Sequence, residues 1–199
     1  MNQLLTEREE KILLSLKKLD YLNRDQLQII HRLGSVRNTN RILKGLSNYL
    51  SSFREEYSTI YYLNKDGREY VNSQKKRKKN SFINHVIMRN YFYIYTGMPS
   101  DWKNEIKVYD GTYTIICDTY FKVRKRYHFL EVDLTQKMSE NRKKIENYYG
   151  LMKCQSVKKY LGYFPQLIWL TSTEYRRKQL NELCKDIPST AVYTLDDIK

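Results

Sequence analysis

The stretch over residues 127–150 constrains the fold of this chain more than any other. Residues 127–134 are mostly apolar and rich in β-formers, and this pattern predicts a strand. Alternate side chains of a strand share a face, so Glu131 and Asp133 are expected on the same face. A basic helix is predicted to follow at once. A strand that brings two carboxylates beside a basic helix indicates an α/β layer with a polar site.

The C-terminal part of the chain, from residue 81 onward, alternates between helical and extended patterns. Ser139 is the expected N-cap of the basic helix, and Asp118 is expected to end the second strand. This mixture predicts an α/β sheet with helices on its faces. The expected elements are a helix over 81–96, strands over 105–108, 112–117 and 127–134, a helix over 139–153, a strand over 166–170, a helix over 173–184 and a strand over 191–195.

The N-terminal part predicts three short helices and a hairpin. Thr6 and Glu9 form a capping box before an apolar stripe at helical spacing. A second helix is expected from Asn23, and Ser35 is expected to cap a third that runs to about Leu50. A tyrosine-rich strand over 57–63 then suggests a wing. Two helices, a glycine turn and a third helix predict a winged helix-turn-helix, whose third helix reads the major groove of DNA.

Polar residues suited to reading DNA gather on the predicted third helix. Arginine can bind guanine through two hydrogen bonds, and asparagine can bind adenine in the same way. A three-helix packing module with a solvated face is the alternative interpretation. The candidate DNA-binding residues here are Ser35, Arg37, Asn38, Asn40, Arg41 and Lys44, with Arg54 on the hairpin.

The segment over residues 73–80 is the clearest predicted boundary, because it has no apolar residue and contains five consecutive basic ones. Lys75, Lys76, Arg77, Lys78 and Lys79 are expected to be solvated, and as a tether they would contact phosphate. The predicted organisation is therefore a winged-helix domain over 1–73, a basic linker over 74–80 and an α/β domain over 81–199.

The charge balance favours a polyanionic partner. Among 199 residues, 36 basic and 22 acidic side chains give a formal net charge of +14. Nucleic acid is the commonest partner of such a protein, although a basic protein whose charge serves only solubility is the alternative. We find no signal peptide, no membrane-spanning run and no paired cysteine motif among three cysteines, and therefore expect a cytoplasmic protein without membrane contact.

Several stretches together resemble a known family. They are YYLNKDGREYV at 61–71, NHVIMRNYFYIY at 84–95, Cys117-Asp118, FLEVD at 129–133, NRKKIENY at 141–148 and FPQLIWLTSTEYR at 164–176. In order and spacing, the chain resembles the replication-relaxation family of plasmids and other mobile elements. The resemblance implies a winged helix followed by a restriction-endonuclease-like domain of the PD-(D/E)xK type. It also implies a role in replication, relaxation or mobilisation.

The resemblance also implies a candidate catalytic site. Asp118 and Glu131 match the two acidic residues that hold Mg²⁺ in active nucleases, since hard cations prefer oxygen ligands. Asp133 stands where those nucleases have lysine, and it cannot supply a positive charge. Lys143 or Lys144, on the following helix, would replace that lysine. In the alternative interpretation, the three carboxylates pair with Arg142 or Lys144 to hold the fold.

Other chemistry has less support in the sequence. His31, His85 and His128 are scattered without metal-ligand spacing, and no phosphate-binding glycine loop occurs. A relaxase would need a histidine cluster beside its tyrosine, so we expect an accessory protein rather than a relaxase.

Three functions remain open at this stage. The first is a sequence-specific double-stranded DNA-binding protein of a plasmid or mobile element, whose nuclease-like domain is inactive and which needs no cofactor. The second is a Mg²⁺-dependent nuclease or nickase that uses Asp118 and Glu131. The third is a dimeric transcriptional repressor with a palindromic site. Expected partners are double-stranded DNA, replication or relaxosome proteins and a second copy of the chain.

Overall fold

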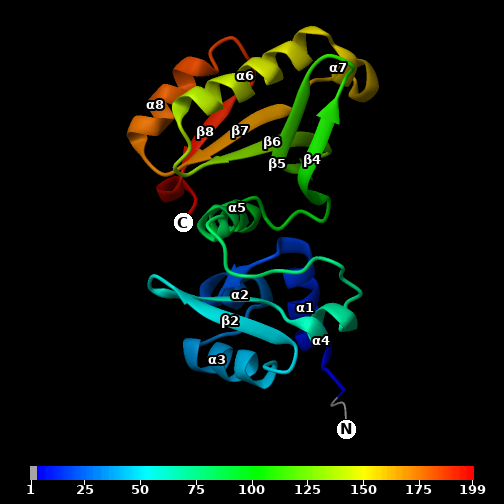
Figure 1. The fold of residues 1–199 in the computed structure, drawn as a ribbon, viewed down its shortest axis with the longest axis vertical. Coiled ribbons are helices and arrows are strands. Elements are labelled where there is room, and N and C mark those ends of the chain that lie inside the picture. Colours follow the sequence, from blue (N-terminus) through cyan, green and yellow to red (C-terminus); the bar gives the residue numbers. More distant parts are fainter. Residues whose placement is uncertain (1–3) are drawn as a thin grey trace. The chain divides into compact units, whose positions relative to one another are not determined.

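The computed structural model describes residues 4–199, and the chain divides into two compact units between Ile94 and Tyr95 (Figure 1). The sequence placed the boundary at residues 74–80. In the structure, the helix expected to open the second domain instead packs with the first unit.

The first unit combines short helices with a small antiparallel sheet. Its strands lie in the order β1-β3-β2, and β2 and β3 form a hairpin that turns at Glu56 and Tyr57. Three helices and a hairpin therefore lie where the sequence predicted them. The elements are α1 (Glu7–Leu19), β1 (Leu22–Asn23), α2 (Arg24–His31), α3 (Val36–Gly45), β2 (Leu50–Glu55), β3 (Ser58–Leu63), α4 (Lys65–Tyr70) and α5 (Ile83–Tyr95).

Side-chain caps explain where the first three helices begin. The Thr6 and Asn23 side chains each form a reciprocal capping box with the residue three positions later, and Ser35 accepts a hydrogen bond from the backbone N–H of Asn38. The third helix ends at Gly45, earlier than predicted, because Leu50 already belongs to β2.

Helix α5 completes the core of the first unit. Its Ile83 and Ile87 pack with Tyr21 and Ile60. The side-chain amide of its Asn90 also donates to the carbonyl oxygens of Leu19 and Tyr21, at 3.0 and 2.7 Å. These buried contacts explain why the helix packs with this unit.

The second unit is a mixed α+β domain built on a five-stranded sheet, β4-β5-β6-β7-β8. The first three strands are antiparallel, and β6, β7 and β8 are parallel because helices connect them. The elements are β4 (Trp102–Tyr109), β5 (Thr114–Val123), β6 (Arg126–Asp133), α6 (Met138–Lys153), α7 (Ser156–Leu161), β7 (Gln166–Thr171), α8 (Glu174–Leu183), β8 (Ala191–Thr194) and a 3-10 turn, η1 (Leu195–Asp197).

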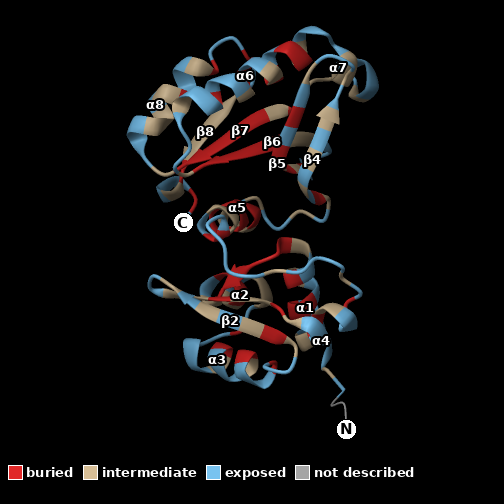
Figure 2. Cartoon of the chain, viewed as in Figure 1, coloured by how far each residue is buried: buried red, intermediate tan, exposed pale blue. Residues whose placement is uncertain are grey.

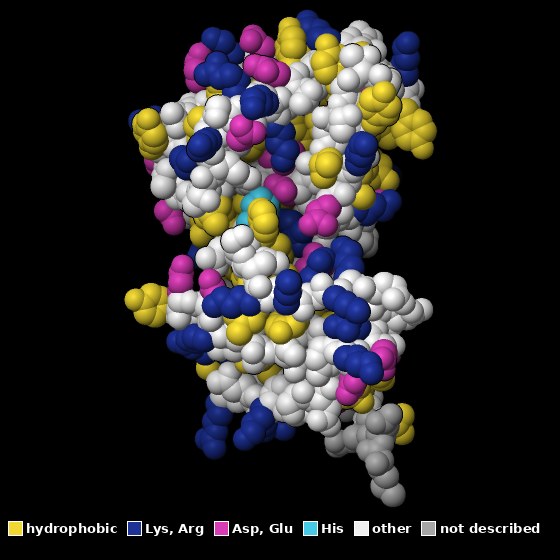
Figure 3. Space-filling model, in the orientation of Figure 1, with side chains coloured by type: hydrophobic (Ala, Val, Ile, Leu, Met, Phe, Trp, Pro, Cys, Tyr) yellow, Lys and Arg dark blue, Asp and Glu magenta, His cyan; other side chains and the backbone are white. Residues whose placement is uncertain are grey.

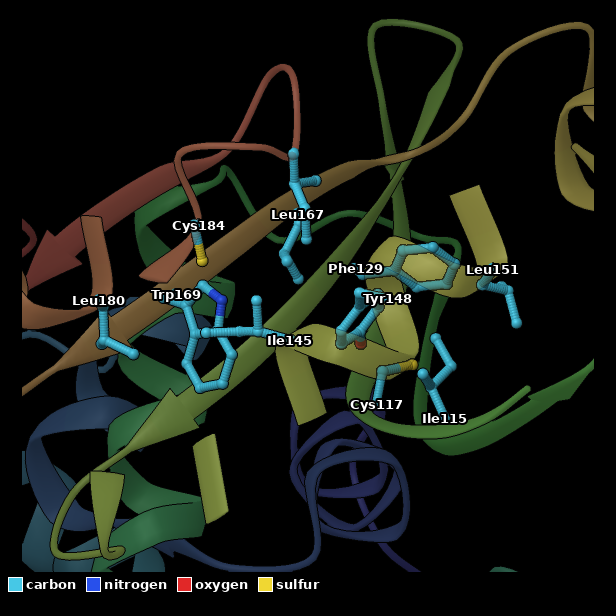
Figure 4. Packing of buried hydrophobic residues seen from close by; sticks show 11 residues of the cluster. Ile115, Cys117, Phe129, Ile145, Tyr148, Leu151, Leu167, Trp169, Leu180 and Cys184 are labelled. Carbon is cyan, nitrogen blue, oxygen red and sulfur yellow. The ribbon is translucent and has the colours of Figure 1, made fainter. Parts of the chain in front are cut away.

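The core of the second unit lies between this sheet and the helices α6 and α8 (Figures 2 and 4). Phe129 of β6 and Trp169 of β7 pack there with Tyr148 of α6 and Leu180 of α8, all almost fully buried. A Cβ atom at Gly150 would lie only 2.3 Å from the Tyr113 ring, so glycine lets α6 approach this tyrosine directly.

Four details of the second unit differ from the predictions. Asp118 lies inside β5 and does not end it, because the strand continues to Val123. The hairpin after it turns at Arg124 and Lys125, both with positive φ, where a turn signal usually contains Asn or Gly. Helix α6 begins at Met138 after Lys137, so Ser139 is not its N-cap. The short helix α7 was not predicted.

None of the described helices combines the length and the apolar character that crossing a membrane requires.

Candidate functional site

Helix α3 presents a polar face to solvent. Thr39 and Leu43 are buried on one side of the helix. Arg37, Asn40, Arg41 and Lys44 are all exposed, and Figure 3 shows Lys and Arg side chains standing out where Figure 1 draws α3. The exposed cations lie at helical spacings of four and three residues, which places them along one face.

Two of the residues predicted to contact DNA have structural partners within this helix. Ser35 caps the helix at a distance of 3.2 Å from the Asn38 nitrogen. The Asn38 side chain donates to the Leu33 carbonyl oxygen at 2.7 Å and accepts from Arg41 Nη2 at 2.9 Å. Asn38 therefore orients Arg41, which is the more exposed of the two side chains.

The hairpin β2–β3 holds the remaining candidate of the first unit. Arg54 is exposed, and its Nε donates to the Glu56 carbonyl oxygen at 3.3 Å. Tyr57 at the turn is 94% exposed.

The basic segment over residues 75–79 is partly neutralised by the first unit. Arg77 forms an ion pair with the buried Asp20, and Lys75 lies 3.7 Å from the same carboxylate. Lys79 pairs with Glu55 at 2.8 Å. Of these three side chains only Arg77 is partly buried, and Lys75 and Lys79 stay exposed, as do Lys76 and Lys78.

In the second unit, Asp118 and Glu131 come together where two strands separate. Strands β5 and β6 pair only as far as Thr119 and Leu130, so the next residues are no longer joined by the ladder. Asp118 Oδ2 accepts the backbone N–H of Val132 at 2.7 Å. The structure thus brings together the two carboxylates that the sequence singled out.

Glu131 is fully buried and has two side-chain donors from α6. Tyr148 donates its hydroxyl proton to Oε1 at 2.6 Å, and Lys144 forms an ion pair with Oε2. Burial, followed by the nearby charge of Asp118, raises the pKa of Glu131 to about 8. Burial alone would lower the pKa of Lys144, but the carboxylates of Glu131 and Asp118 raise it overall.

Asp133 shares the α6-facing side of β6 with Glu131, and it belongs to a separate ion pair. Arg176 of α8 binds both of its oxygens at 2.6 Å. Asn141 of α6 donates to Oδ1 at 2.8 Å, and the Thr171 hydroxyl to Oδ2 at 3.0 Å. This carboxylate is therefore a buried structural group, paired with an arginine that the sequence analysis did not consider.

The other basic residues predicted for this site lie elsewhere. Lys143 is exposed and pairs with Glu140 at 3.2 Å, on the solvent side of α6. Arg142 is also exposed, so the predicted pairing of a carboxylate with Arg142 is not found. Of the candidates on this helix, only Lys144 joins the carboxylates.

A divalent cation fits this arrangement poorly. Within residues 4–199, no three His, Cys, Asp or Glu side chains are grouped to hold a metal ion. Two carboxylates can suffice for Mg²⁺ when waters complete the octahedron. Both oxygens of Glu131 already accept hydrogen bonds, however, so a cation would have to displace Lys144 or Tyr148.

The sequence analysis missed four side-chain partners of these carboxylates: Tyr148, Asn141, Thr171 and Arg176. Tyr148 and Lys144 are four residues apart, and Asn141 precedes Lys144 by three, so helical spacing could have placed all three on one face of α6. Nothing in the local pattern indicates Arg176, because α8 reaches Asp133 only through the tertiary fold.

Comparison with known proteins gives one family match. The model of the replication-relaxation family matches residues 13–167. No curated protein matches the chain. Among solved structures, the restriction endonuclease FokI is similar, with a TM-score of 0.36 and 12% identity over all of this chain and 45% of the FokI chain. The chain thus spans less than half the length of FokI, and no property of FokI is transferred to it.

Proposed function

Because the chain belongs to the replication-relaxation family, we propose that it is a sequence-specific double-stranded DNA-binding protein of a plasmid or other mobile element. It would act in replication, in mobilisation or in the regulation of either. The first unit serves as a winged helix, with α3 in the major groove and the β2–β3 hairpin as the wing.

The exposed face of α3 is the observation that best supports this proposal. Arg37, Arg41 and Lys44 reach solvent from one face of a helix whose other face is buried, and Asn38 orients Arg41. The protein also has a net charge of +14, which favours a polyanion. Arginine held in a fixed orientation is the side chain best suited to bidentate contact with guanine.

The second unit has a different role in this proposal. It resembles a nuclease domain in the order of its elements, and it would act as a scaffold whose buried carboxylates hold the fold. The proposal includes a role as a transcriptional repressor. In that role the protein would act as a homodimer and bind a palindromic DNA site.

The test is binding of Arg41→Ala to DNA from the element's own origin region, measured against unrelated duplex of equal length. If Arg41 contacts a base, the variant loses ~1–3 kcal/mol of specific binding and discriminates less between the two duplexes. The control is Arg142→Ala, which removes an exposed arginine of the second unit. Equal weakening on both duplexes would exclude a base-reading role.

One observation favours a second function, metal-dependent DNA cleavage through Asp118 and Glu131. Lys144 forms an ion pair with Glu131. It therefore lies where a lysine of the following helix could replace the one whose place Asp133 occupies. The test incubates supercoiled origin DNA with Mg²⁺, with Mn²⁺ and with EDTA, beside the variants Glu131→Ala and Lys143→Ala. Nicking that needs metal and that only Glu131→Ala abolishes would establish the enzyme. Intact plasmid in every lane would support the scaffold role.

A further inference from the structure

The second unit contains a hollow lined mainly by apolar and aromatic side chains, away from the carboxylates described above. Its volume is about 330 Å³. The sheet forms its floor, with Ile106 and Val108 of β4, Tyr120 of β5 and Phe129 of β6, and α7 forms one wall. This volume is at the small end of ligand pockets, which span roughly 300–1,000 Å³.

Two tyrosines of this hollow are mostly in contact with solvent. Tyr160 of α7 is 89% exposed, and Tyr109 at the end of β4 is 61% exposed. Below them, Tyr120 stacks on Tyr127 with ring centroids 4.6 Å apart. Both rings therefore keep much of their surface in contact with solvent, so the rim of the hollow can receive a further planar ring.

Exposed lysines lie on α7, which forms one wall of the hollow, and at the end of the preceding helix α6. Lys158 and Lys159 precede Tyr160 on α7, and Lys153 ends α6 with its ammonium 5.2 Å from the centre of the Tyr149 ring. All three lysines are exposed, and within residues 4–199 none forms an ion pair with a carboxylate. Their charge is therefore available to an anion from outside the chain.

The hollow has one acidic group, Asp110, whose carboxylate oxygens already accept hydrogen bonds from the protein. The backbone N–H groups of Thr112 and Tyr113 donate to it at 2.9 and 2.7 Å, and the Cys154 thiol also donates to it. These donors lower the pKa of Asp110 to about 2, with the thiol the largest cause. Both oxygens of this carboxylate are thus occupied by donors of the protein itself, and it leaves the aromatic part of the hollow to a ligand.

We propose that this surface binds a single DNA strand, with one unpaired base stacked on Tyr160 and Tyr109 at the hollow and the backbone phosphates on Lys153, Lys158 and Lys159. Exposed aromatic rings interleaved with lysines are how proteins bind single strands, because every base has a π-face and every nucleotide a charge. A duplex would not satisfy this site, since its bases are stacked and paired. The site is separate from the duplex-binding face of α3.

The experiment measures binding of the full chain to a fluorescent oligothymidylate of about 12 nucleotides, within the roughly 4–16-nucleotide sites of single-strand binding folds. The double variant Tyr109→Ala/Tyr160→Ala should bind it about tenfold or more weakly, as loss of base stacking predicts. The matched control is Tyr175→Ala on α8, which removes a tyrosine that is 71% exposed elsewhere on the same unit. Lys158→Glu/Lys159→Glu should also bind the oligothymidylate more weakly than wild type. The difference in affinity should grow as the salt concentration is lowered, because the variant has lost phosphate contacts.

Binding to origin duplex separates this proposal from the previous one. The tyrosine variant should keep its duplex affinity, and Arg41→Ala should keep its affinity for the oligothymidylate. The proposal is overturned if the wild-type chain does not bind the oligothymidylate, or if the tyrosine variant binds it as tightly as Tyr175→Ala does. Loss of single-strand binding in Arg41→Ala alone would also overturn it, because the strand would then lie on α3.

Discussion

Charged residues occur in two contrasting settings in this molecule, on the surface of α3 and inside the second unit. On α3 the cations reach solvent, and Arg41 is hydrogen-bonded to Asn38 of the same helix. On β6, Glu131 and Asp133 are 0% exposed, and each has at least two side-chain partners. Exposed charges can change partners at little cost in free energy, whereas buried ones cannot. The contrast separates a surface suited to binding from charges that hold a fold.

The largest effect is expected from breaking a buried pair. Arg176→Ala would leave the fully buried Asp133 with no cation, and it should lower the free energy of unfolding by ~3–5 kcal/mol. Urea unfolding monitored by tryptophan fluorescence would measure it, since Trp169 lies in the core of the same unit. Arg142→Ala, at an exposed position, should stay within about 0.5 kcal/mol of wild type. Equal stabilities of the two variants would contradict the structural role of Asp133.

The second prediction concerns pH. Because the pKa of Glu131 is raised from 4.5 to about 8 in the folded state, this group stabilises the fold fully below pH 4.5 and loses that contribution as pH rises through 8. Glu131→Gln does not titrate, and Lys144 stays charged throughout. The stability of wild type relative to Glu131→Gln should therefore fall between pH 5 and 8, by at most ~1.4 kcal/mol per pH unit. Parallel stability curves for the two proteins would show that the carboxyl titrates normally.

A smaller effect tests whether α3 depends on its cap. Ser35→Ala removes the side-chain acceptor for the Asn38 N–H and should cost ~1 kcal/mol of stability. Thr6→Ala removes the equivalent cap from α1 at a similar cost. Only Ser35→Ala should also weaken duplex binding, because it loosens the helix that presents Arg41. If both variants lose DNA affinity equally, the loss comes from the stability of the unit and not from α3.

Local patterns predicted most of the fold. The capping residues Thr6, Asn23 and Ser35 mark true helix starts, and the apolar runs at Phe129 and Leu167 lie in neighbouring core strands. The misses have local causes as well. The turn at Arg124 and Lys125 lacks the residues that usually adopt positive φ, so no local pattern indicated that β5 extends past Asp118.

The site could be predicted only in part. The family resemblance suggested both the proximity of Asp118 and Glu131 and a lysine from the following helix, Lys143 or Lys144, and the structure places Lys144 there. The burial of these groups could not be predicted, because charged residues in a pattern look the same whether they face solvent or a core. The partner of Asp133 lies 43 residues away on another helix, so only the folded chain reveals it.

The contact between Gly150 and Tyr113 has a consequence far from where it occurs. The missing side chain at Gly150 sets how closely α6 approaches the tyrosine ring at the start of β5, with a Cβ atom only 2.3 Å from that ring if one were present. Lys144 lies six residues earlier on the same helix, ~9 Å along its axis at 1.5 Å per residue. A side chain at this position would require either the Tyr113 ring or α6 to move. A substitution here therefore reaches the Lys144–Glu131 pair whenever the helix is the part that gives way, although neither charged residue has been altered.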